Sequence, residues 1–146
     1  MSYPVLLALH LIAAIAFAGT VFFEVVMLDG VRRHVPREAL RLVESAIGAR
    51  ARRVIPWVLL VLYGAGAGLA WQHRAALADP LAGSFGLLLG IKILLALSVF
   101  GHFLAAMALQ RRGRLNTRNS RRIHISVFCH VALIVLLAKA MFYITW

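Results

Sequence analysis

Long apolar stretches alternate with short arginine-rich segments along this chain. Four stretches are long and apolar enough to cross a bilayer as helices, which takes about 20 residues. They cover residues 3–28, 54–71, 84–110 and 123–146. Helices are expected because hydrocarbon offers backbone N–H and C=O groups no partner. The first stretch lacks a basic region before it and an obvious cleavage site, so we expect it to remain as a helix rather than be removed as a signal peptide.

Apolar positions at helical spacing also precede the second stretch, among charged residues of alternating sign. This pattern extends the second helix back to about residue 38. We therefore predict an all-α integral membrane four-helix bundle that forms a single transmembrane domain over residues 1–146. Its helices are expected over about 3–28, 38–72, 84–110 and 120–145.

The composition agrees with a membrane protein. Of the 146 residues 62% are hydrophobic and only 14% are charged, whereas soluble domains are about half apolar and about a quarter charged. Cys129 is the single cysteine, which excludes a disulfide scaffold.

The net charge of +11 is a topology signal. Of the 16 lysines and arginines, seven lie in residues 32–53 and six in residues 111–122. The positive-inside rule then places these two loops in the cytoplasm and both termini on the outer, periplasmic side of a bacterial-type inner membrane. The expected partner is the lipid bilayer, with anionic lipid attracted to the same side, and nucleic acid is not expected.

Function is expected from the ionisable residues at membrane depth, because each is costly unless it faces the bundle interior or a water-filled cavity. There are seven of them: His10, Glu24, Lys92, His102, His124, His130 and Lys139. His10 and Lys92 each lie about seven or eight residues into a helix that starts outside, so they are expected at a similar depth. His130 and Lys139 lie on nearly opposite faces of one helix, so only one of them is expected to face the bundle axis.

Three kinds of chemistry fit these residues. Two imidazoles, or an imidazole and a neutral amine, can take the axial positions of a haem between helices. Cu(I) favours soft ligands, but Cys129, Met27, Met107 and Met141 form no CxxC or MxxM motif. A proton relay would use histidine, glutamate and lysine directly.

Small residues predict close helix contacts. Gly64, Gly66 and Gly68 form one small-residue face and Gly86 with Gly90 another. Such GxxxG spacing allows two helices to pack closely, either within one bundle or between the two chains of a homodimer. No internal repeat is expected.

Three parts of the sequence match a known pattern. They are His10 followed by Phe17-Ala18-Gly19 and Phe22-Phe23, then Gly90-Ile91-Lys92 with Gly101-His102, and Lys139 near the end. In these residues the chain resembles the HemJ-like and CopD-like family of four-helix integral membrane proteins. HemJ-type proteins are haem b-binding protoporphyrinogen IX oxidases in which the first-helix histidine and third-helix lysine are important, which here implies His10 and Lys92. CopD proteins are associated with copper uptake or resistance.

These observations predict an inner-membrane haem b-binding redox protein, an oxidoreductase or electron carrier. It would pass electrons between a quinone or porphyrin-type substrate in the membrane and an acceptor, with CopD-like copper transport or resistance as the alternative. The cofactor-binding residues are expected to be His10, Lys92, His102 and His130, of which the three histidines are also the candidate metal ligands. Lys92 and Lys139 are the candidate catalytic residues.

Overall fold

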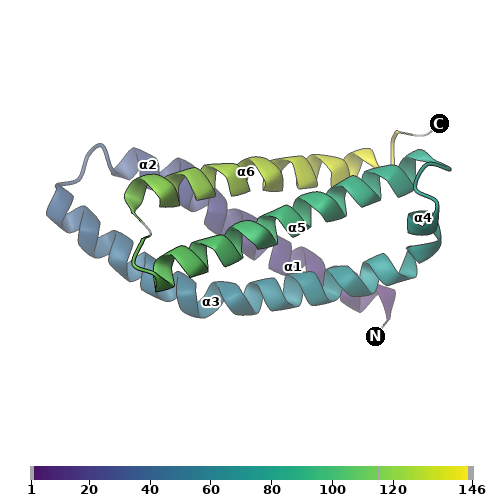
Figure 1. Cartoon of the computed structure of the whole chain (residues 1–146), viewed down its shortest axis with the longest axis horizontal. Helices are drawn as coiled ribbons and strands as arrows, with labels where there is room; N and C mark the ends of the chain where they lie inside the picture. Colours follow the sequence, from purple (N-terminus) through teal and green to yellow (C-terminus); the bar gives the residue numbers. More distant parts are fainter. Residues whose placement is uncertain (1, 115, 145–146) are drawn as a thin grey trace. The chain divides into compact units, whose positions relative to one another are not determined.

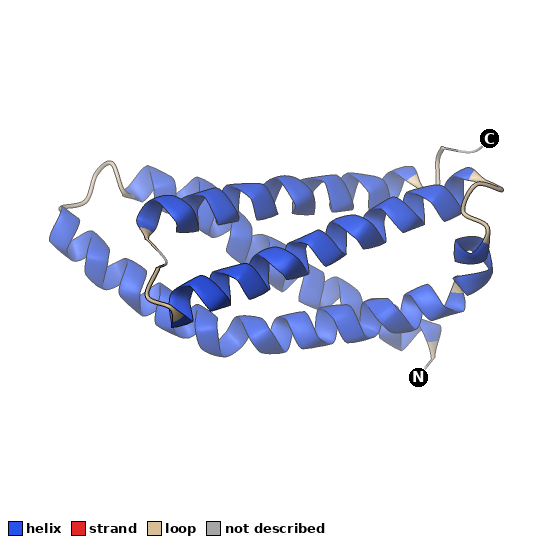
Figure 2. Cartoon of the chain, viewed as in Figure 1, coloured by secondary structure: helices blue, strands red, loops and turns tan. Residues whose placement is uncertain are grey.

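The computed structural model describes residues 2–114 and 116–144, and these residues form helices joined by short turns. Figures 1 and 2 show the elements, and no strand is present among the described residues. In chain order they are α1 (Tyr3–Phe22), the π-helical turn η1 (Phe23–Met27), α2 (Leu28–Val31), α3 (Arg37–Gln72), α4 (Arg74–Ala78), α5 (Ser84–Arg111) and α6 (Thr117–Ala140).

Four helical segments of the described chain are long and apolar enough to cross a membrane. They are Tyr3–Val31, Arg37–Gln72, Ser84–Arg111 and Arg118–Ala140. The first combines α1, η1 and α2. The predicted all-α class and the four apolar helices are therefore confirmed.

Helix α6 begins and ends a few residues earlier than its hydropathy predicts. The side chain of Asn116 caps it by accepting a hydrogen bond from the N–H of Asn119 at 2.8 Å. Such a cap satisfies one of the four N–H groups that have no partner inside the helix. Helix α5 ends just before, where Gly113 adopts a positive φ of 64°. The N–H of Arg114 then bonds the carbonyl of Leu109 at 2.9 Å, as in a Schellman motif.

Residues 1–72 form one compact unit, a hairpin in which α1 packs along α3. Helix α1 buries Ala13, Phe17 and Val21, which recur every four residues on one face. Helix α3 buries Leu59 and Ala65 and runs through Pro56 without interruption.

One of the small residues of α3 lies close to α1 near the start of the chain. A Cβ atom on Gly68 would lie 3.0 Å from Cδ1 of Leu6, so a larger residue would make the Leu6 side chain move by a few tenths of an ångström, whereas a Cβ on Gly64 would meet no atom within 4 Å. Part of the predicted small-residue face therefore makes a close helix contact. Gly64 is not a point of close approach within the unit.

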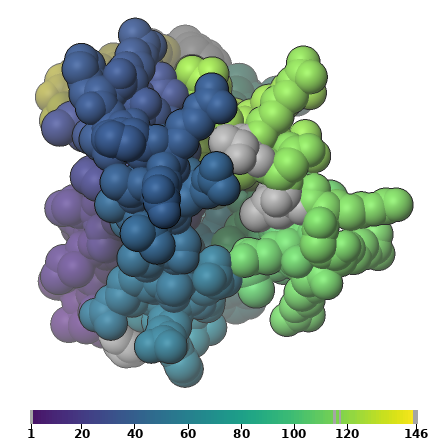
Figure 3. All heavy atoms as spheres, turned by 90° about the vertical axis from the view of Figure 1, so that its left-hand side faces the viewer, coloured from purple at the N-terminus to yellow at the C-terminus, as the bar shows by residue number. Residues whose placement is uncertain are grey.

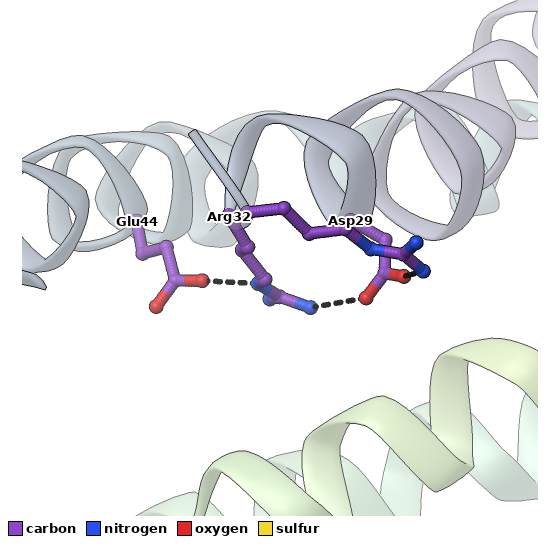
Figure 4. Close-up of polar contacts among 4 residues, drawn as sticks. Asp29, Arg32 and Glu44 are labelled. Carbon is purple, nitrogen blue, oxygen red and sulfur yellow. Dashed lines mark hydrogen bonds and ion pairs between the residues drawn. The ribbon is translucent and has the colours of Figure 1, made fainter. Parts of the chain in front are cut away.

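Ion pairs fix the connection between α2 and α3 (Figure 4). Nε of Arg32 lies 2.6 Å from Oε1 of Glu44, and Nη1 of Arg32 lies 3.6 Å from Oδ1 of Asp29. Nη2 of Arg33 reaches the other oxygen of Asp29 at 3.5 Å. Arg32 therefore joins a carboxylate of its own helix to one of α3, while Arg33 adds only a local contact.

Residues 73–146 form the second unit, in which α5 packs along α6 and α4 contacts α5. A Cβ atom on Gly86 would overlap the carbonyl oxygen of Ala76 and lie 3.2 Å from Cα of Pro80, so only glycine fits at this crossing. Beside it, the ring of Phe85 contacts that of His73 at 5.3 Å and that of Phe142 at 6.0 Å between centroids.

The turn between α5 and α6 carries exposed arginines. Figure 3 views the chain from this end, and long side chains of residues near 110–122, in green, project outward. The exposed arginines are Arg111, Arg112, Arg114, Arg118, Arg121 and Arg122.

Most of the apolar surface of the helices is also exposed. Ile15, for example, is 72% exposed and Leu94 is 68% exposed, which suits contact with lipid.

Replacement of Arg32 by Gln is expected to lower the free energy of unfolding by about 1 kcal/mol, because it removes a charged hydrogen bond that joins two helices. The matched control is Arg33→Gln, which removes the same charge from a side chain that is 76% exposed. Thermal unfolding in detergent measures both. Equal effects of the two substitutions would contradict this role of Arg32.

Candidate functional site

His10 is half-buried on α1 and is held by a backbone carbonyl of α3. Its Nδ1 lies 3.0 Å from the carbonyl oxygen of Leu62. A carbonyl can only accept, so Nδ1 carries the hydrogen and donates it, and the second ring nitrogen, Nε2, carries the lone pair. The hydrogen bond therefore fixes both the tautomer and the orientation of the ring.

Gly66, one helical turn after Leu62, makes room for this ring. A Cβ atom on Gly66 would lie 3.1 Å from Cε1 and 3.2 Å from Nδ1 of His10, closer than ordinary van der Waals contact. The sequence predicts Gly66 as part of a small-residue face, but it does not show that His10 is the side chain that packs against it.

His102 and His130 form a reciprocal pair in the second unit, on α5 and α6. The centroids of their rings lie 5.3 Å apart, and the ring planes are inclined at 56°. The sequence predicted that these two residues could serve as a pair of cofactor ligands, and in the structure their rings lie side by side.

Each imidazole of this pair uses both of its nitrogens. Nδ1 of His102 donates to the carbonyl of Ser98 at 2.7 Å, and Nδ1 of His130 donates to the carbonyl of Ser126 at 2.8 Å. Nε2 of His102 accepts from the hydroxyl of Ser126 at 3.0 Å, and Nε2 of His130 accepts from the hydroxyl of Ser98 at 3.1 Å. Each histidine is therefore oriented by its own helix and bonded by the serine of the other helix.

A short internal repeat builds this arrangement. The segment Ser98-Val99-Phe100-Gly101-His102 recurs as Ser126-Val127-Phe128-Cys129-His130. Both valines are buried, at 4% and 6% exposed, and the residues at the fourth position, Gly101 and Cys129, are both exposed. The expectation of no internal repeat is thus wrong at this scale. The two copies lie on antiparallel helices and contact each other as the two sides of an isologous interface do.

The two lysines occupy different surroundings. Lys92 is half-buried on α5, and the described part of the chain gives its ammonium no hydrogen bond and no ion pair. Lys139 is exposed in the last turn of α6, with Nζ 5.2 Å from the centroid of the Tyr143 ring. That cation–π contact holds its charge close to the end of the helix. Their catalytic roles stay predictions.

The remaining polar residues at membrane depth are half-buried and partnered. Glu24 lies in the π-helical turn η1, a kind of distortion that is frequent at functional sites, and His124 lies on α6. Among the described residues no three His, Cys, Asp or Glu side chains come together as a metal site. Cys129 is exposed, and of the expected soft ligands Met141 is buried.

No family model matches the chain, and no curated protein or solved structure matches it. The resemblance to HemJ-like and CopD-like proteins therefore stays a prediction that rests on the residues quoted for it.

Substitution of either serine of the reciprocal pair is expected to have the same effect on stability. Ser98→Ala and Ser126→Ala each remove the hydroxyl that donates to one imidazole nitrogen. Each is therefore expected to lower the free energy of unfolding by about 1 kcal/mol. Ser45→Ala, on an exposed face of α3, is the control and is expected to change little. Unfolding in detergent, followed by circular dichroism, checks this. A large difference between the first two substitutions would contradict the equivalence of the two halves.

Proposed function

We propose that this protein is a bacterial-type inner-membrane redox protein that binds haem b through Nε2 of His10. The observation that carries the proposal is the 3.0 Å hydrogen bond from Nδ1 of His10 to the carbonyl of Leu62. Histidines that bind a metal almost always donate their other N–H to a carbonyl or carboxylate, which fixes the tautomer and raises the basicity of the ligating nitrogen. A histidine on a membrane helix could hold a haem in this way.

The serine hydroxyls make His102 and His130 less suited to hold a metal. The lone pairs of these two histidines at Nε2 each accept a serine hydroxyl at 3.0–3.1 Å. Ligation by either of them would break that hydrogen bond. A haem also needs only one or two protein ligands, so it does not require a cluster of three.

Lys92 belongs to the second unit, and its role at a haem stays a prediction. A half-buried ammonium at membrane depth favours an anionic partner, and a lysine must be neutral to coordinate a metal, so a carboxylate suits Lys92 better than a metal does. Lys139 is exposed near the end of its helix.

The bound group would supply one-electron chemistry, and the chain would position it and tune its potential. The proposed reaction passes electrons between a quinone or porphyrinogen in the membrane and an acceptor, with both termini on the periplasmic side. In this scheme the Leu62 carbonyl adjusts the electron density of the ligand through its hydrogen bond to His10.

The test is the absorption spectrum of the purified full chain after haem supplementation. We expect a Soret band and, after dithionite reduction, an α-band, both lost in His10→Ala and kept in His124→Ala. A colourless wild-type protein rejects the proposal, and an unchanged spectrum in His10→Ala rejects the ligand. A colourless protein that retains stoichiometric copper would instead favour CopD-like copper transport.

Gly66→Ala tests how the ligand is held. The added methyl group is expected to displace the His10 ring and to weaken haem retention about 10-fold or more, as loss of a ligand's supporting contacts commonly does. Gly64→Ala adds the same methyl group where nothing lies within 4 Å and should leave the spectrum unchanged. Haem titration followed at the Soret band measures both variants, and equal effects would count against the role of Gly66.

A further inference from the structure

The turn between α5 and α6 carries a positive charge that its own unit does not offset. Its six arginines, within residues 111–122, are all exposed. The unit of residues 73–146 has one carboxylate side chain, that of Asp79, which precedes α5 and therefore lies at the opposite end of this 28-residue helix. Like charges gathered at one place repel each other, so this turn favours an anion from outside the unit.

The other arginine-rich segment, residues 29–53, is balanced from within. Asp29, Glu38 and Glu44 lie among its arginines, and Arg32 pairs with the first and the last of them. The positive-inside rule counts basic residues and gives acidic residues little weight. It therefore explains the arginines of both segments, but it does not explain why one segment contains carboxylates and the other has none.

The arginines of α6 lie at the depth of lipid phosphates if the apolar part of the helix crosses a bilayer. That part begins at Ile123, and Arg118 precedes it by about 8 Å along the helix axis. The headgroup region of each leaflet is about 5–8 Å thick. Arg118 and Arg122 therefore fall within the headgroup region, and Arg111, the last residue of α5, lies at the end of the neighbouring apolar helix.

The two arginines continue into an exposed apolar face of the same helix. At 100° per residue Arg118, Arg122, Ile125, Cys129 and Leu136 fall within about 60° of one another, and all five are exposed. Ile125 is 41% and Leu136 66% exposed. One face of α6 therefore presents guanidinium groups at headgroup depth and apolar side chains below them. A phospholipid has the same division into phosphate and acyl chains, whereas a soluble anion or a nucleic acid would match the arginines alone.

We propose that this face of α6 binds an anionic phospholipid, with its phosphate held by Arg118 and Arg122 and its acyl chains along the apolar side chains. Residues four apart on a helix are neighbours, so both guanidinium groups can reach one phosphate. The planar guanidinium donates two parallel hydrogen bonds to phosphate oxygens, which a lysine does not. Arg111, Arg112 and Arg114 add positive charge that attracts the headgroup. The site uses residues of the second unit only, so it does not depend on haem binding by His10.

Native mass spectrometry of the full chain in detergent tests the proposal, because it counts the lipids that stay bound. Phosphatidylglycerol and phosphatidylcholine with identical acyl chains are added separately. We expect phosphatidylglycerol to bind about 10-fold more tightly, since only its headgroup has a net negative charge. Equal retention of the two lipids would overturn the proposal. Displacement of the lipid by an equal concentration of inorganic phosphate or of a short oligonucleotide would also overturn it, because the acyl chains would then contribute nothing.

Substitutions locate the site. Arg118→Gln combined with Arg122→Gln is expected to weaken phosphatidylglycerol binding about 10-fold or more, because both phosphate contacts are lost. The matched control is Arg37→Gln combined with Arg41→Gln, which removes the same charge at the same spacing from exposed positions of α3 and should leave the affinity unchanged. Equal losses in the two double variants would show attraction to overall charge and would contradict a site on α6.

Replacement of the same two arginines by lysine tests the guanidinium contacts. Arg118→Lys combined with Arg122→Lys keeps the charge but removes the paired donors, so its affinity should fall between those of the wild type and the glutamine variant. Binding as tight as in the wild type would contradict the role of the guanidinium groups. Circular dichroism of each variant checks that the helices are retained.

Discussion

In an apolar environment a polar group without a partner is costly, and backbone carbonyls supply the partner for three histidines of the chain. His10, His102 and His130 each donate Nδ1–H to a helix carbonyl at 2.7–3.0 Å. All three rings therefore carry the same tautomer. At His102 and His130 Nε2 accepts a serine hydroxyl of the neighbouring helix, which ties α5 to α6. At His10 the supporting carbonyl is the feature on which the proposed metal ligand rests.

The sequence predicts the helices well because their signal is strong. A run of about 20 apolar residues has few alternatives to a membrane-spanning helix. Helix ends are less well predicted, since they depend on single contacts such as the Asn116 cap and the positive φ of Gly113. Hydropathy marks neither end of α6, because the helix begins within a charged segment and the sequence stays largely apolar after its last turn.

The contacts at the candidate sites were beyond prediction for a physical reason. A helix that is apolar on all sides does not show which face packs inward, so rotation about its axis is left open. In this chain small residues and polar pairs set the rotation of each helix about its axis. Gly66 leaves space for the His10 ring, and Ser98 forms a hydrogen bond with His130. The five-residue repeat was visible in the sequence, but its meaning depends on antiparallel packing, which places each serine opposite the histidine of the other copy.

The two polar centres also differ in what a substitution can do to them. The His10 contact is one-sided, since a single carbonyl and a single glycine hold the ring, and a change at Gly66 acts on it alone. The histidine–serine pair is reciprocal, so each residue both gives and receives a hydrogen bond, and a substitution in one half removes a hydrogen bond from the other. Reciprocity of this kind couples the two rings. A large planar group placed between the same two helices would first have to separate both serine contacts, so the pair suits the packing of α5 against α6 better than it suits ligation.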